Sequence, residues 1–234
     1  MIKSFHLKKA WGVLGVAVLS ITALFVGIRI VSGQSISDLL GRSYAAGAGD
    51  DRPVAWVGDE YISLGQFIGL KEVLVNVEKV PPEQANQVAL NRLVRIKIIQ
   101  LLAKERGLTP EPVEVEDRLA LLYEQAAQNP EILAILEPQA KVRGMDWESE
   151  AFKDLLRESL IHALEAEHLY QQVLEQAGGD SSIALSRVDD LIVERYSSLD
   201  IRFEVSNLPE DALNIHPPSI DDLSASQSLQ DEIP

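Results

Sequence analysis

An uncharged apolar stretch near the N-terminus constrains this chain more than any other feature of its sequence. Residues 10–28 (AWGVLGVAVLSITALFVGI) contain no charged side chain. As a helix they would extend ~28 Å, close to the ~30 Å hydrocarbon core of a bilayer. Basic residues precede the stretch, so the positive-inside rule places the N-terminus in the cytoplasm and the rest of the chain outside it (Lys3, Lys8, Lys9). We therefore expect a cytoplasmic leader over residues 1–9 and a single transmembrane helix over residues 10–31.

A cleaved signal peptide is the alternative, because its basic and apolar regions have the same pattern. The small residues Ala46-Gly47-Ala48 lie far beyond the apolar stretch, whereas cleavage after Gly33 stays open. The chain has no cysteine. A lipoprotein anchor, a disulfide scaffold and a cysteine-ligated zinc site are therefore excluded.

The charge of the chain is strongly acidic and unevenly distributed. The formal net charge is −15, and the first 49 residues carry five basic side chains against one acidic side chain. The remainder is therefore more acidic than the total. Such a surface repels phosphates, so we expect no nucleic-acid partner and no binding to anionic headgroups.

The remainder divides by composition into three parts. Residues 32–52 are rich in glycine, serine and alanine and predict a flexible linker. Residues 53–205 carry the apolar periodicity of a folded domain. Residues 206–234 combine acidic residues and prolines with no lysine or arginine, which predicts an acidic disordered tail.

The domain is predicted to be mainly α, with a short two-stranded β pairing of its ends. The strands are expected at residues 53–58, turning at Gly58-Asp59, and at residues 201–205. Ser63 with Gln66 predicts a capping box for the first helix, Asn129-Pro130 starts the fourth, and Asp146 is expected to cap the fifth. The remaining bounds follow from proline and glycine positions: helices over 82–105, 112–128, from 130 to a bend or end at Pro138, 146–177 and 182–199.

No constellation for catalysis is present in the sequence, and we expect no enzyme activity, cofactor or metal. His162, Glu165 and His168 share a predicted helix, but they supply only half of a helical carboxylate–histidine metal site. A solvated polar face is the preferred interpretation. Trp56 and Trp147 are expected to be core residues and not ligand stackers, and Phe67 and Tyr123 are expected to be packed and not to bind clients. Trp11 is expected to be an interfacial anchor.

Four phrases, in order, resemble the N-terminal domain of SurA-type and PrsA-like extracytoplasmic chaperones. VAWVGDEYISLGQF (54–67) resembles the opening strand, turn and capped helix of that domain, and ALNRLVRIKIIQLLAKERGLTP (89–110) resembles its long helix. VEVEDRLALLYEQ (113–125) resembles the start of the acidic helix that follows, and RGMDWESEAFKDLLRESLIHALEAEHL (143–169) resembles a later helix of the family that begins after a glycine. The turn Gly58-Asp59 in place of Asn-Gly departs from the family pattern, as does Glu111-Pro112 in place of an acidic cap.

The resemblance implies a membrane-anchored chaperone module, a holdase, that binds unfolded or exported polypeptides outside the cytoplasm. Relatives often carry a parvulin prolyl isomerase domain between the last two helices, whereas only GGDSS (178–182) stands there in this chain. We therefore expect no isomerase activity. The client-binding residues cannot be named from the sequence. The alternative is a membrane-tethered scaffold or assembly factor that binds one folded protein partner.

Overall fold

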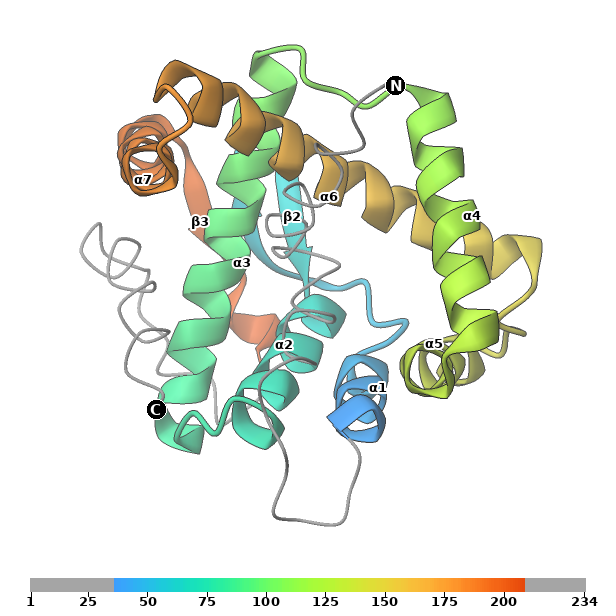
Figure 1. Ribbon diagram of the computed structural model, residues 1–234. Helices are drawn as coiled ribbons and strands as arrows, with labels where there is room; N and C mark the ends of the chain where they lie inside the picture. Colours follow the sequence, from blue (N-terminus) through green and yellow to red (C-terminus); the bar gives the residue numbers. More distant parts are fainter. Residues whose placement is uncertain (1–35, 209–234) are drawn as a thin grey trace, which may run out of the picture.

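The computed structural model describes residues 36–208, which form seven α-helices and one three-stranded sheet (Figure 1). The mainly helical class is therefore confirmed. In chain order the elements are α1 (Ile36–Ala46), β1 (Pro53–Val57), β2 (Glu60–Ser63), α2 (Leu64–Asn76), α3 (Pro82–Glu105), α4 (Pro112–Gln128), α5 (Pro130–Val142), α6 (Glu150–Gln176), α7 (Ser181–Ser198), β3 (Ile201–Phe203) and a 3-10 turn (Val205–Asn207).

The sheet joins the two ends of the domain, as predicted, but it has three strands and not two. The order is β2-β1-β3, with both pairings antiparallel. The β1–β2 hairpin turns at Gly58, whose φ of 61° suits glycine. The strand β2 was missed because its four residues run directly into the helix that Ser63 caps, which leaves too short a stretch for a visible alternation.

Most of the hydrophobic core lies in one part of the molecule, which we call the main lobe. It comprises the sheet, α2, α3, α7 and the C-terminal half of α6. Fully buried side chains from these elements meet around the spine helix α3, including Phe67, Leu90 and Ile98. Their apolar burial is the main source of stability for the domain.

The helices α4 and α5, which we call the arm, stand apart from this core. Two small apolar clusters attach the arm to the N-terminal half of α6, one around Leu119 and Leu160 and one around Leu136 and Phe152. No substantial packing joins α4 or α5 to α2 or α3 within residues 36–208. In Figure 1 the long helix α6 crosses the molecule from α7 to the arm.

Helix α1 is a second connection between the lobes, and it corrects the prediction of a flexible linker over residues 32–52. Leu40 is fully buried and packs with Val73 of α2 and Ile135 of α5. The backbone of Gly41 lies against the Ala134 carbonyl, where an added Cβ would approach to 2.3 Å. Small residues were interpreted as a tether, but they also permit close contact between helices. Residues 32–35 of the predicted linker lie outside the described residues.

A proline within α5 explains where α1 packs. Pro138 lies inside the helix and does not end it, contrary to one predicted alternative. Proline has no N–H to donate to the carbonyl four residues earlier, which is that of Ala134. Gly41 of α1 covers this same carbonyl and also approaches the Pro138 ring.

The predicted helix caps are mostly confirmed. Ser63 and Gln66 form the capping box of α2, with 3.1 Å from the Gln66 N–H to the Ser63 hydroxyl. Asn129 caps α5. Asp146 does not cap α6, because the helix begins one turn later and Ser149 takes that role. Asp146 instead accepts from the Glu148 N–H in the preceding turn.

The ends of the domain differ from the predicted boundaries on the C-terminal side. Leu208 is buried in the main-lobe core, and the Asn207 side chain donates to the Pro53 carbonyl at 2.8 Å, so these residues belong to the fold and not to the tail. Within residues 36–208 no helix is long and apolar enough to cross a membrane. The predicted anchor and residues 209–234 of the predicted tail lie outside the described residues.

Candidate functional site

A group of charged residues lies where α6 passes from the main lobe to the arm, and we call it the junction cluster: Glu60, Lys97, Lys104, His162 and Glu165. Lys104 Nζ lies 2.5 Å from Glu60 Oε1, and Lys97 Nζ lies 3.6 Å from Glu60 Oε2. His162 Nδ1 lies 3.2 Å from Glu165 Oε2 on α6. Glu60 is also under the electrostatic influence of His162, and Lys104 under that of Glu165. The cluster thus links β2, α3 and α6.

The electrostatics of the junction cluster are those of an ion-pair network. The hydrogen bond from Lys104 lowers the pKa of Glu60 and, reciprocally, raises the pKa of Lys104. Burial lowers the pKa of Lys97 more than Glu60 raises it. The ion pairs join β2 to α3, and α6 interacts with them through the charges of His162 and Glu165.

The two histidines on α6 do not converge. His168 Nε2 lies 2.9 Å from Glu114 Oε1, and its Nδ1 lies 3.3 Å from the Leu108 carbonyl, so His168 holds the start of α4. Glu165 is 1 % exposed, which corrects the interpretation of this face as a solvated one. Across residues 36–208 no three histidine or carboxylate side chains are grouped closely enough to hold a metal ion.

Two pairs of aromatic rings lie outside the main core, one on the sheet and one beside the arm. Trp56 lies on the outer face of the sheet, 5.5 Å from the Tyr61 ring and with the Arg202 guanidinium 5.8 Å from its centroid, so its prediction as a core residue is wrong. On the arm side, Tyr123 stacks on Trp147 with ring centroids 5.3 Å apart.

The two residues weighed as client contacts are both packed. Phe67 is fully buried and cannot touch a client in the folded state. Tyr123 is half-buried, and its hydroxyl donates to the Trp147 carbonyl at 2.5 Å. The packing predicted for both residues is confirmed.

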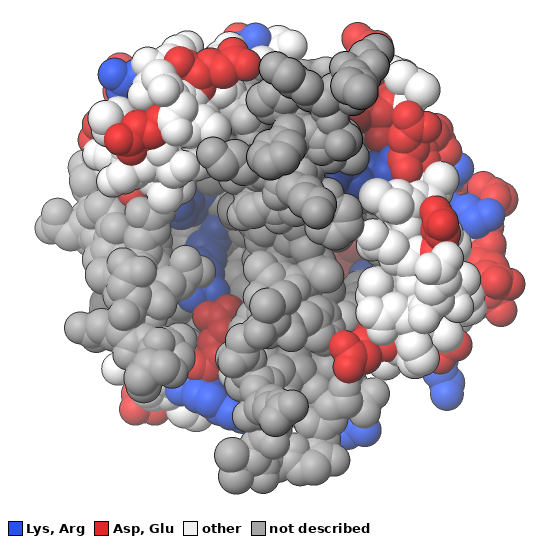
Figure 2. Space-filling model, in the orientation of Figure 1, with Lys and Arg blue, Asp and Glu red and all other residues white. Residues whose placement is uncertain are grey.

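Exposed large apolar side chains are concentrated on the arm. Val113 and Leu121 of α4 are 67 % and 44 % exposed, and Val142 at the end of α5 is 55 % exposed. The main lobe, whose helices and strands contain more than twice as many residues, exposes the same number (Tyr61, Ile183, Leu185). In Figure 2 the visible face of the arm shows a run of uncharged side chains bordered by carboxylates.

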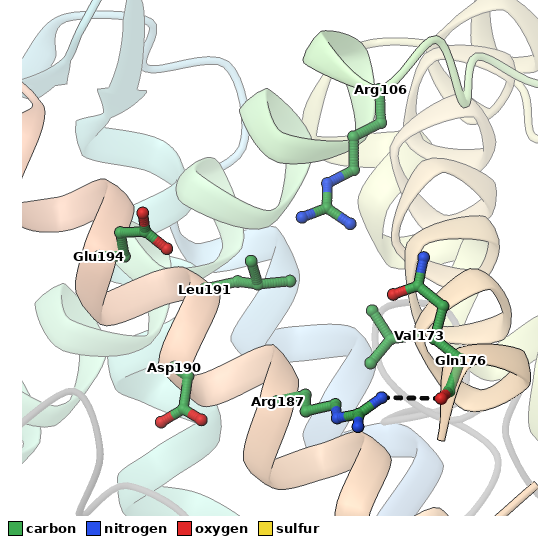
Figure 3. A pocket seen from close by; sticks show the side chains of 7 residues that line it. All are labelled: Arg106, Val173, Gln176, Arg187, Asp190, Leu191 and Glu194. Carbon is green, nitrogen blue, oxygen red and sulfur yellow. Dashed lines mark hydrogen bonds between the residues drawn. The ribbon is translucent and has the colours of Figure 1, made fainter. Parts of the chain in front are cut away.

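A shallow pocket of about 270 Å³ lies between the end of α3, the C-terminal half of α6 and α7 (Figure 3). Its walls combine two arginines with an apolar floor and an acidic rim. No local pattern predicts this pocket, because its lining residues come from three separate parts of the chain (Arg106, Val173, Gln176, Arg187, Asp190, Leu191, Glu194).

Comparison with known proteins assigns no function to these residues. No protein-family model, no curated protein and no solved structure matches the chain. The resemblance to SurA-type chaperones therefore stays a prediction, and the function must be argued from the molecule itself.

Proposed function

We propose that this protein is a membrane-anchored, extracytoplasmic holdase that binds unfolded or exported polypeptides. The observation that carries the proposal is the attachment of the arm. Among residues 36–208, the arm packs substantially against α1 and α6 alone, through small apolar clusters, and it exposes a disproportionate share of the large apolar side chains. A separately attached arm of this kind can adjust to chains of different sequence.

The binding mechanism would be passive. Extended apolar segments of a client would cover side chains such as Val113 and Leu121, which gains apolar burial without any covalent step. Binding of the unfolded client competes with its aggregation. Anchoring beside the site of export would raise the effective concentration of emerging chains, so weak contacts would suffice.

The acidic surface favours the same function. The chain has 36 acidic and 21 basic side chains, and many carboxylates are visible among the coloured atoms of Figure 2. The resulting field keeps a protein with exposed apolar groups soluble and apart from its own copies. It also favours clients that carry net positive charge.

The module would act without prolyl isomerisation. Helix α6 ends at Gln176 and α7 begins at Ser181, so a four-residue connection stands where relatives of the resembled family carry their catalytic domain. A standard proline-peptide assay with the full chain should show no acceleration over the uncatalysed rate, and measurable acceleration would contradict this part of the proposal.

Aggregation of chemically unfolded clients tests the holdase directly. The full chain in nanodiscs should reduce light scattering of several unrelated unfolded proteins at a few-fold molar excess. Val113→Ser with Leu121→Ser should remove most of this effect. The matched control is Ile183→Ser with Leu185→Ser on α7, where both side chains are similarly exposed; it should retain the effect.

Two outcomes would overturn the proposal. If the wild-type chain fails to reduce scattering for any client, it is not a holdase, and copurification with one folded partner would then favour a scaffold or assembly factor. If the arm and α7 variants lose the effect equally, the arm is not the binding surface.

A further inference from the structure

The pocket between α3, α6 and α7 contains two arginines for which the described part of the chain supplies no ion-pair partner. Arg106 Nη1 donates to Gln172 Oε1 at 3.1 Å, and Arg187 Nη1 donates to the Gln176 carbonyl at 2.8 Å. Neither forms an ion pair with any residue in 36–208, whereas Arg92, Arg157 and Arg195 do. In a chain of net charge −15 with an excess of carboxylates, two such arginines in one pocket are unusual.

The two guanidinium groups face the space inside the pocket, where a ligand could reach them. In Figure 3 the Arg106 guanidinium enters from one side and the Arg187 guanidinium from the opposite side. The Asp190 carboxylate points away from the space between them, and Glu194 lies on the other side of Leu191 from Val173. Each guanidinium carries five N–H donors, and the bonds above use one. Donors therefore remain for a carboxylate, which guanidinium groups bind with well-defined geometry.

The floor between the arginines is apolar. Val173 is 1 % exposed and belongs to the main-lobe core, and Leu191 packs beside it. A volume of about 270 Å³ is below the usual range of cofactor and drug-sized sites, roughly 300–1,000 Å³. A ligand must therefore present a carboxylate and an apolar group within the size of about one residue.

We propose that this pocket binds the C-terminal residue of a polypeptide, with its carboxylate between Arg106 and Arg187 and its apolar side chain on the partly buried Leu191, above the core residue Val173. A C-terminal leucine or valine carries both groups in one residue. An internal aspartate or glutamate carries the carboxylate but must take the apolar group from a neighbouring residue, for which the pocket has little space. The inference rests on the proposed function, since it defines which end of a client is recognised.

Peptide binding by the full chain in nanodiscs tests this site. The probe is a fluorescein-labelled peptide of uncharged residues that ends in leucine with a free carboxylate, followed by fluorescence anisotropy. Its C-terminal amide should bind at least tenfold more weakly, because the amide lacks the charge that the arginines recognise. Arg106→Gln and Arg187→Gln should each weaken binding of the free-acid peptide to a similar extent.

Matched controls distinguish binding in the pocket from a non-specific attraction between the peptide and positive charge on the protein. Arg202→Gln removes the same charge from an exposed pair on β3 and should leave binding unchanged. An amidated peptide with an internal Leu-Glu pair should bind no better than the plain amide. Circular dichroism shows whether each variant is folded. If a glutamine variant does not fold, Arg106→Lys and Arg187→Lys replace it. Both lysine variants should bind the free-acid peptide more weakly than wild type, because lysine lacks the planar guanidinium that pairs with a carboxylate.

Equal binding of the free-acid and amide peptides would overturn the proposal. So would a loss of affinity in Arg202→Gln as large as in the pocket variants, or binding of the internal Leu-Glu peptide as tight as that of the free-acid peptide. The outcomes also separate this site from the proposed function. Binding of the free acid without reduced client aggregation supports the pocket and rejects the holdase. Reduced aggregation that both arginine variants retain, without selectivity for the free acid, supports the holdase and rejects the pocket.

Discussion

The main lobe and the arm are made of the same kind of amphipathic helix, yet they differ in the number of buried apolar side chains that hold them in place. The main lobe surrounds α3 with one continuous cluster to which the sheet, α2, α6 and α7 all contribute. The arm depends on three small clusters, each with three or four buried side chains among the described residues. Regions with few buried contacts open at lower free energy than the global unfolding transition. The difference indicates that the arm can move while the main lobe stays folded.

The largest effect is expected from the centre of the main lobe. Phe67→Ala removes a fully buried ring and should lower the free energy of unfolding by about 3–5 kcal/mol. Urea unfolding of the domain followed by far-UV circular dichroism measures this change. Tyr61→Ala, at a ring that is 40 % exposed, is the control and should cost much less. Similar costs for the two variants would contradict the description of the core.

The corresponding change in the arm should remain local. Phe152→Ala empties the cluster that holds α5 on α6, at a cost of about 3 kcal/mol, the low end of the range for such a truncation, because the thin cluster can collapse. Hydrogen exchange should accelerate in α4 and α5 and remain slow in α3 and β1. Equal acceleration in α3 would show that the two lobes unfold as one unit.

The packing of α1 can be tested by replacing two glycines at its contacts with alanine. A Cβ at Gly41 would lie 2.3 Å from the Ala134 carbonyl oxygen, so Gly41→Ala should push α1 from α5 and cost about 1–3 kcal/mol. A Cβ at Gly69 would meet α1 at an ordinary 3.7 Å, and Gly69→Ala should be neutral or stabilising by up to ~1 kcal/mol. Thermal unfolding compares the two, and an equal loss would argue against close packing at Gly41.

The smallest effect is a pH-dependent one at the junction cluster. The hydrogen bond from Lys104 lowers the pKa of Glu60 in the folded state, so this pair stabilises the fold above the unfolded pKa of about 4.3 and the contribution is lost as pH falls through the folded pKa. Glu60→Gln should therefore cost about 1 kcal/mol or less at neutral pH, since the pair is partly solvated, and progressively less as the pH falls below the unfolded pKa. Stability curves of both proteins from pH 3 to 7 measure the difference. A cost that is independent of pH would rule out the ion pair as its source.

Local signals in the sequence were sufficient for much of the fold. The Ser63 capping box, the Asn129-Pro130 start of α5 and the bounds of α3 are set by residues within a turn of each other, and all three agree with the structure. The pairing of the domain's ends was also predicted, from a strand at each end with the right apolar pattern.

The failures share a different cause. Gly41 and its neighbours were interpreted as a linker because their contact surface lies on α5, almost a hundred residues away. Glu165 was expected in solvent because helical spacing shows which residues share a face but not what covers that face. The pocket arginines Arg106 and Arg187 become neighbours only when α3, α6 and α7 cross. Such features depend on the placement of whole helices, which local patterns do not determine.

The position of α1 has a mechanical consequence. Its buried side chain Leu40 touches α2 on one side and α5 on the other. A pulling force applied along the chain before α1 would therefore act on both lobes at once, and not on the main lobe alone. Such a load would therefore be shared between α2 of the main lobe and α5 of the arm.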